Sequence, residues 1–126
     1  MPAYRLARVL NATRQSVVAE RCRIAQGFVR TVFGLHLLPR LEADEGLLLP
    51  GATTIDTAFM SYPIDLVFLD RSGAVTRVVH DMRPWRIVLG GHGGKDCLEL
   101  AAGTAARSST QVGDLVELTD LPVSEP

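Results

Sequence analysis

The chain has 126 residues, 47% of them hydrophobic and 21% charged, and a formal net charge of -1. This composition is that of an ordinary globular domain, and it excludes a wholly disordered chain. The near-neutral charge also argues against the basic surface of a general nucleic-acid binder. The length predicts a single domain over residues 1–126, large enough to fold without disulfides or metals, and the Pro-bearing tail at 119–126 is expected to be frayed.

The N-terminus and the lack of a long apolar run favour a soluble cytoplasmic protein. The opening residues, MPAYRLARVL, include basic side chains but no apolar stretch typical of a signal peptide. No apolar run approaches the roughly 20 residues that cross a bilayer. Cys22 and Cys97 each fall in a predicted strand, where free cysteines are usually buried as small hydrophobic side chains. Two buried thiols are therefore expected, and a disulfide between them stays open.

Alternating apolar and polar residues predict an N-terminal β-hairpin. Its strands are YRLARVLN (residues 4–11) and SVVAERCRI (residues 16–24), and the residues ATRQ (12–15) separate them. The period then changes, because Phe28, Val32 and Leu35 have helical spacing. The sequence therefore predicts one short amphipathic helix near residues 25–36.

After this helix the chain is predicted to be mainly β. The nearly continuous apolar run IDLVFLD, from residue 64, is typical of a strand buried on both faces. DRSG then has the Asp and Gly positions of a type I turn, and AVTRVVH is the partner strand, so a hairpin is expected over residues 63–80. Further strands are predicted at 47–49, in TIDTAFM, at 85–89, at 97–100 and in VGDLVEL.

One helical turn is predicted in GTAARSS, with Thr104 as its N-cap. Many short strands with one helix predict a mostly-β (α+β) fold. It should be either a compact small β-barrel or two packed antiparallel sheets, with one short helix near residues 25–36.

The sequence offers no established cofactor motif. The Gly-rich loop GGHGGKD places Asp96 after Lys95, where a phosphate-binding loop needs Ser or Thr. The histidines and cysteines lack metal-ligand spacing, and no G-x-S-x-G nucleophile motif is present. We therefore expect no cofactor, no metal and no catalytic residue from these motifs, and we interpret the loop as a strand connection.

Four residues remain as candidates for a binding site. RPWR (residues 83–86) flanks Trp85 with arginines, including Arg86, and such a cluster can stack on a flat ligand and hold an anion. The alternative is a Trp that anchors a loop. Asp65 interrupts an apolar strand, where a charge needs a hydrogen-bonding partner, so it is either structural or part of a site. Asp56 lies in a weaker strand among threonines and is the fourth candidate.

The pattern FM…PIDLVFLD..G.V..VV resembles the core motif of the DUF192 family, also called UPF0127. EGLLL, RPWR, LEL, AGTAA and VGD follow in the order and spacing of that family, so the resemblance covers about residues 5–118. It implies a small mostly-β domain of bacteria and archaea, in exported and cytoplasmic versions, without an established activity. The recurrent positions of the family are matched by Phe59, Met60, Pro63, Asp65 and Asp70.

Asp56 departs from the family pattern, because relatives of this subtype often carry His at its position. If that His serves a site, Asp56 changes both its charge and its capacity to donate hydrogen bonds.

The leading hypothesis is a non-enzymatic ligand-binding or accessory domain whose ligand-binding residues are Asp56, Asp65, Trp85 and Arg86. The ligand would be a small polar molecule, a saccharide or a peptide segment. One alternative is an enzyme acting on such a ligand, with Asp65 as acid or base. Another is a protein-interaction module, which predicts an exposed apolar patch on the order of several hundred Å². No nucleic acid or membrane partner is expected, and the oligomeric state is left open.

Overall fold

The computed structural model describes residues 4–25, 40–56 and 62–122. Within these ranges the mostly-β prediction is confirmed, and the helix predicted near residues 25–36 falls almost entirely outside them. The described elements are nine strands and one short helix: β1 (Tyr4–Asn11), β2 (Ser16–Ala25), β3 (Glu45–Leu49), β4 (Thr54–Asp56), β5 (Ile64–Leu69), β6 (Val75–Met82), β7 (Ile87–Leu89), β8 (Asp96–Ala101), α2 (Thr104–Arg107) and β9 (Val116–Asp120).

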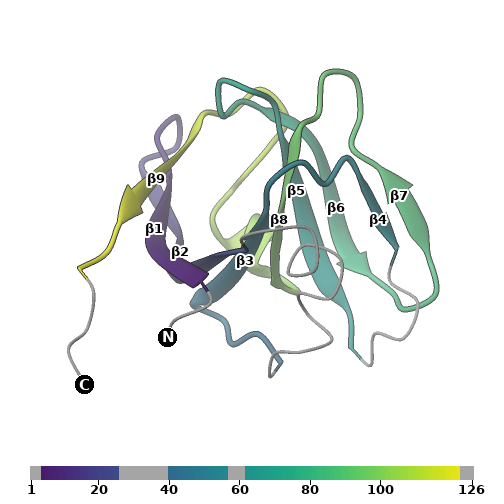
Figure 1. Ribbon diagram of the computed structural model, residues 1–126, viewed down its shortest axis with the longest axis horizontal. Helices are drawn as coiled ribbons and strands as arrows, with labels where there is room; N and C mark the ends of the chain where they lie inside the picture. The colour runs from purple at the N-terminus through teal and green to yellow at the C-terminus, as the bar shows by residue number, and fades with distance from the viewer. Residues whose placement is uncertain (1–3, 26–39, 57–61, 123–126) are drawn as a thin grey trace.

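The strands form one large curled sheet and one small sheet (Figure 1). The large sheet has seven strands in the order β6-β5-β8-β3-β2-β1-β9, and β4 pairs with β7 in the small sheet. All of these pairings are antiparallel except β2 with β3, which is parallel. This one parallel pair was not predicted from the sequence. The chain between β2 and β3 has the length that a parallel crossover needs, about a dozen residues or more.

The curl of the large sheet brings its two outer strands together at one end. An isolated bridge joins Ala74 to Leu115. Beside it, the Val75 N–H donates to the Asp114 carbonyl at 2.8 Å, and the Val116 N–H donates to the Gly73 carbonyl at 2.9 Å. Because these bonds connect the start of β6 to the start of β9, the sheet is a half-barrel whose outer strands meet at this end.

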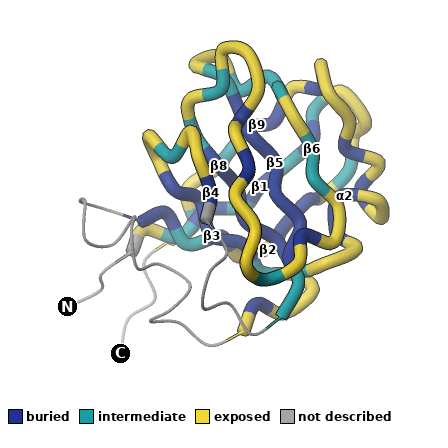
Figure 2. The backbone as a smooth tube through the Cα atoms, turned by 90° about the vertical axis from the view of Figure 1, so that its right-hand side faces the viewer, coloured by how far each residue is buried: buried dark blue, intermediate teal, exposed yellow. Residues whose placement is uncertain are grey.

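Two hydrophobic clusters lie on opposite faces of the large sheet, and β5 contributes to both. Val67 and Leu69 belong to the cluster on the concave face, which also includes Ala105 of α2. Ile64, Leu66 and Phe68 belong to the cluster on the other face. Every residue of β5 is buried, which confirms the strand predicted from the continuous apolar run (Figure 2).

The small sheet covers part of the second cluster. Ile55 of β4 and Val88 of β7 are buried members of that cluster. The Gly90 N–H donates to the Thr53 carbonyl at 2.8 Å and extends the β4–β7 ladder by one pair. The small sheet therefore has one face on the core and one face outward, and its outward face is considered below.

The two predicted hairpins are confirmed, with β1 paired to β2 and β5 paired to β6. In the second hairpin the Gly73 N–H donates to the Asp70 carbonyl at 3.1 Å and closes the predicted turn. The predicted N-cap is wrong. Thr104 is already inside α2, and Gly103 is the N-cap residue, with a φ of 95° and no side-chain hydrogen bond. Glycine adopts this left-handed conformation at little steric cost.

The two cysteines are free and buried, as expected. Cys22 packs in the cluster on the concave face, and Cys97 packs in the cluster on the opposite face. Burial raises the pKa of the Cys22 thiol to about 12 and raises that of Cys97 well above its usual value. Both therefore stay protonated thiols at neutral pH. Among the described residues, no helix has the length and apolar character needed to cross a membrane.

Candidate functional site

Asp65 is the predicted site residue with the clearest structural role. Its side chain is fully buried on the concave face of the sheet. One carboxylate oxygen accepts the Asp81 N–H at 2.8 Å, and the other accepts the N–H groups of Gly103 at 3.0 Å and Ala105 at 2.9 Å. These bonds tie the end of β6 and the start of α2 to β5. Because both carboxylate oxygens already accept backbone N–H groups, Asp65 is poorly placed to bind a ligand.

The other three predicted site residues lie near one another on the small sheet. Asp56 pairs with Ile87 in the β4–β7 ladder. Trp85 and Arg86 immediately precede Ile87, and both are exposed. The structure therefore brings the backbone of Asp56 close to Trp85 and Arg86, and it places Asp65 on the other face of the large sheet.

Sequence reasoning missed two neighbours of Trp85 that extend its surface. Trp85, Ile87 and Leu89 have exposed fractions of 64%, 69% and 63%, whereas the intervening Val88 is 9% exposed. Ile87 and Leu89 point to the same face of β7, because alternate residues of a strand do so. Trp85 lies before β7, two residues from Ile87, and is also exposed. These three exposed side chains are here called the apolar stripe. WRIVL contains all three, but outward and inward residues were not distinguishable without the partner strand.

The backbone at the head of the apolar stripe is unusual. Trp85 has a φ of 64°. A bulky side chain in this left-handed region is a conformational outlier, with a cost of about 1–3 kcal/mol, and such residues cluster at functional sites. The fold therefore places its single tryptophan outward in a strained conformation, which a purely structural turn would more easily fill with Gly or Asn.

The edge of β7 that faces away from β4 is partly occupied. The Arg77 guanidinium of β6 donates to the Leu89 carbonyl at 2.8 Å, and the Thr76 hydroxyl donates to the Gly90 carbonyl at 2.8 Å. These bonds anchor the small sheet to β6. Because they use backbone acceptors at this edge, the outward face of the small sheet is better suited to binding than its edge.

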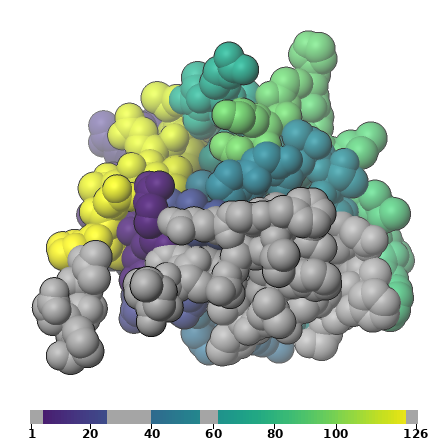
Figure 3. Space-filling view, in the orientation of Figure 1, coloured from purple at the N-terminus to yellow at the C-terminus, as the bar shows by residue number. Residues whose placement is uncertain are grey.

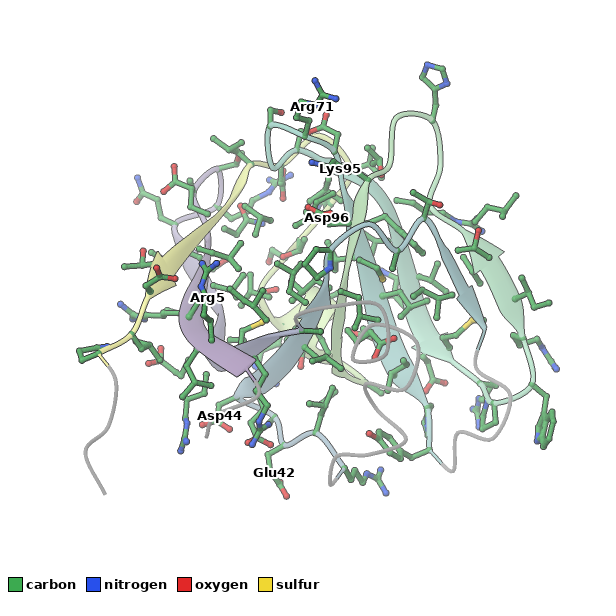
Figure 4. All side chains as sticks on the ribbon, in the orientation of Figure 1. Arg5, Glu42, Asp44, Arg71, Lys95 and Asp96 are labelled. Carbon is green, nitrogen blue, oxygen red and sulfur yellow. The ribbon has the colours of Figure 1, made fainter. Side chains whose placement is uncertain are left out.

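The Gly-rich loop between β7 and β8 projects from the surface (Figure 3). Gly91 and Gly93 both have a φ of 80°, as a tight connection requires. At its end, Asp96 accepts the Gly51 N–H at 2.8 Å and joins the start of β8 to the turn after β3 (Figure 4). This geometry supports a strand connection rather than a phosphate-binding loop.

A second feature lies on the core side of the small sheet, where Glu99 is buried. It stands in β8 between Leu47 of β3 and Leu66 of β5, and its side chain is 4% exposed. Its Oε2 atom has no hydrogen-bond partner among the described residues. Burial raises the pKa of Glu99 to about 8, so the carboxyl is mostly protonated at neutral pH.

Tyr62 packs against the hydrophobic cluster beneath the small sheet, and it carries a second buried polar atom without a hydrogen-bond partner among the described residues. This atom is its hydroxyl oxygen. Burial raises the pKa of Tyr62. The Leu41 backbone opposes the rise, and the Glu99 carboxyl adds to it. The Arg40 guanidinium lies 4.8 Å from the centre of the Tyr62 ring.

Glu99 was detectable in the sequence by the reasoning applied to Asp65. CLEL places one acid within an apolar strand, just as PIDLVFL does. The two acids nevertheless have opposite outcomes. Asp65 faces the backbone amides of α2, and Glu99 faces Leu47 and Leu66, a difference that depends on the strand order.

These features define a class of protein, a small half-barrel β domain with an outward apolar stripe and a separate buried acid. Among the described residues, no group of three or more metal-ligating side chains lies together. The family model of DUF192, described as "Uncharacterized ACR", matches residues 9–118. The chain belongs to this family, as the core motif predicted.

The chain is also similar to one relative in sequence and to two solved structures in fold. A "UPF0127 protein" of Thermococcus sibiricus is 29% identical over 113 residues, which cover 86% of this chain and 73% of the relative. A protein of unknown function from Novosphingobium aromaticivorans has a TM-score of 0.75 and 22% identity, over 90% of this chain and 84% of its own.

The second structure, from Sinorhizobium meliloti 1021, is provisionally described as a transcription regulator. It has a TM-score of 0.77 and 20% identity, over 92% of this chain and 94% of its own. At these identities the two structures show a shared fold and nothing about activity.

Proposed function

We propose that this protein is a non-enzymatic binding domain that holds an extended polypeptide segment of a partner against the outward face of the β4–β7 sheet. The observation that carries the proposal is the apolar stripe, with Trp85 held outward at a φ of 64° and followed by Ile87 and Leu89. Exposed contiguous apolar surface of this kind, on the order of several hundred Å², is typical of interaction sites.

The spacing of the stripe favours an extended segment. Ile87 and Leu89 stand two residues apart in β7, so their side chains are about 6.6–7 Å apart, and a partner strand repeats its own side chains at the same interval. Large aromatic residues with neighbouring arginines are also the usual anchors of interfaces. Trp85 and Arg86 provide this combination at one end of the stripe.

The proposal keeps three of the four residues predicted from the sequence near the interface. Trp85 and Arg86 would contact the partner, and Asp56 lies across the ladder from Ile87. Asp65 is left out because its carboxylate is buried against three backbone N–H groups. The same burial speaks against the enzyme hypothesis, in which Asp65 would reach a substrate as acid or base.

Selection from a library of random displayed peptides tests the proposal. Peptides that bind the wild-type protein are synthesised, and their Kd values are measured by fluorescence anisotropy against the double variant Ile87→Thr/Leu89→Thr. The control is Val112→Thr, which changes a side chain with a similar exposed fraction of 64% in a turn outside the small sheet.

We expect the double variant to bind selected peptides at least about tenfold more weakly, equivalent to about 1.4 kcal/mol, and the control to bind as the wild type does. A selection that yields no binding peptide would contradict the proposal. Equal affinity for the wild type and the double variant would also contradict it.

A further inference from the structure

The buried pair of Glu99 and Tyr62 calls for an explanation that the apolar stripe does not provide. Both side chains face the cluster beneath the small sheet, and the stripe is on the outward face. A buried polar atom without a hydrogen bond costs about 1–3 kcal/mol, so proteins rarely retain one without a use. This pair has two such atoms, Glu99 Oε2 and the Tyr62 hydroxyl oxygen.

A comparison with Glu45 shows that this state is particular to Glu99. Glu45 lies at the start of β3 on the same face. Its Oε1 accepts the Glu42 N–H at 2.9 Å, and its Oε2 is 3.7 Å from the Arg23 guanidinium. Figure 4 shows Glu42 on the segment that leads into β3. Both carboxylate oxygens of Glu45, at the more exposed end of this face, thus have partners among the described residues. Glu99, in the interior of the face, keeps one oxygen without a partner among them.

We infer that Glu99 and Tyr62 form the polar end of a small-molecule site that takes an uncharged ligand with an adjacent hydrogen-bond donor and acceptor, as in a carboxamide. A protonated carboxyl offers one O–H donor and one carbonyl acceptor, and a phenol offers a donor and an acceptor. A carboxamide complements the carboxyl with its own carbonyl and N–H. The surrounding Leu47 and Leu66 suit the apolar remainder of such a ligand.

The charge of the site favours an uncharged ligand over an ion. Burial alone raises the pKa of Glu99, and no cation lowers it. Among the described residues, Glu99 acts on the titration of Tyr62 and Cys97; Arg40 and Glu45 also act on Tyr62, and Asp96 also acts on Cys97. Cys97 is a protonated thiol, and the Arg40 guanidinium lies over the Tyr62 ring. A cationic ligand would have to displace the Glu99 proton, and an anion would have to approach two acids.

Three small probes of the same shape test this inference: acetamide, acetamidinium and acetate, which are uncharged, cationic and anionic. Each is titrated into the 15N-labelled full chain, and the backbone amide shifts of β3, β5 and β8 are followed by NMR. We expect acetamide to produce saturable shifts near Glu99 and the two ions to produce none. The acetamide response should weaken as the pH rises above about 8, because ionised Glu99 loses its O–H donor.

The variants separate binding from folding. Glu99→Gln keeps a donor and an acceptor, so it should bind acetamide with no pH dependence, and Glu99→Leu should fold and lose the response. Tyr62→Phe should weaken binding about fivefold, the effect of one hydrogen bond. Glu42→Gln, at an exposed position, is the control and should respond as the wild type does.

Three results would overturn the inference. They are a tighter response to acetamidinium that strengthens with pH, the absence of a saturable acetamide response in the wild type, and an unchanged response in Glu99→Leu. The amide spectrum of each variant reports its folding in the same experiment, so a misfolded variant is recognised directly. The inference does not depend on the apolar stripe, because the stripe variants leave Glu99 and Tyr62 in place.

Discussion

Asp65 and Glu99 are buried acids in adjacent strands, and their surroundings differ. Asp65 of β5 accepts three backbone N–H groups, whereas Glu99 of β8 keeps one oxygen without a partner among the described residues. The first acid therefore fastens α2 and β6 to the sheet. The second leaves a buried polar atom unsatisfied, which costs stability, and we have proposed that a ligand satisfies it.

Asp65→Asn is expected to destabilise the protein by about 2–4 kcal/mol. The amide replaces one acceptor oxygen with an NH2 group, which would face backbone donors and leave them unsatisfied. The free energy of unfolding is measured by urea denaturation. The control is Asp120→Asn, whose carboxylate is exposed and pairs with Arg5 at 3.0 Å, and which should cost less than about 1 kcal/mol. Equal costs for the two variants would show that Asp65 is not a fastening residue.

Because the pKa of Glu99 is raised, we expect the free energy of unfolding to decrease as the pH rises from mildly acidic to mildly alkaline values. Its folded-state pKa is raised to about 8 from an ordinary value of 4.5. Between these values the folded state holds a proton that the unfolded state has lost, so the free energy of unfolding falls as pH rises. The fall approaches about 1.4 kcal/mol per pH unit within this window and ends above the folded pKa.

The measurement is urea denaturation of the wild type and Glu99→Gln at several values between pH 5 and pH 9. The difference between the two proteins isolates Glu99 from the other titrating groups. We expect the stability of Glu99→Gln relative to the wild type to increase as pH rises. A difference that stays constant with pH would contradict the raised pKa.

At the scale of elements, the small sheet has inward and outward residues that alternate along β7. Val88 is buried in the cluster beneath it, and Ile87 and Leu89 are exposed on either side. Val88→Thr should therefore cost about 1–3 kcal/mol, because it buries a hydroxyl without enlarging the side chain. Ile87→Thr/Leu89→Thr should stay within about 0.5 kcal/mol per site of the wild type.

Urea denaturation compares these variants directly. If the outward double variant destabilised the protein more than Val88→Thr did, Ile87 and Leu89 would be core residues rather than a binding surface.

The sequence predicted elements well where local pattern decides them. The alternation of β1 and β2, the apolar run of β5 and the Asp70–Gly73 turn each depend on neighbouring residues, and the structure has all of them. The parallel pairing of β2 with β3 was missed, because it depends on where the chain returns after a long connection. The N-cap at Gly103 was missed because Asp65, distant in sequence, already binds the first amides of α2.

The candidate site was only partly predictable for the same reason. Trp85 and Arg86 stood out by residue type, but the outward row with Ile87 and Leu89 depends on the pairing of β4 with β7. Glu99 required the strand order, since its apolar neighbours come from β3 and β5. Local sequence identified unusual residues, and the topology decided which of them share a surface.

At the scale of the whole molecule, stability should be unevenly distributed. β5, β8 and β3 lie side by side within the large sheet, and nearly all of their residues are buried. The small sheet has only two short strands and one exposed face. Regions with few buried contacts open at lower free energy than the core.

Hydrogen exchange followed by NMR measures this distribution. The amides of β5 and β8 are expected to exchange most slowly, and those of β4 and β7 faster. Equally slow exchange in both sheets would show that they unfold as a single unit.

The central claim is that the outward face of the β4–β7 sheet binds an extended polypeptide. Its most direct test is NMR mapping of a peptide selected on the wild-type protein, titrated into the 15N-labelled chain. We predict that the largest amide shifts fall on Thr54–Asp56 and on residues 85–89, and that Ile87→Thr/Leu89→Thr removes them. Shifts concentrated on β1, β2 and β9, or unchanged in the double variant, would contradict the claim.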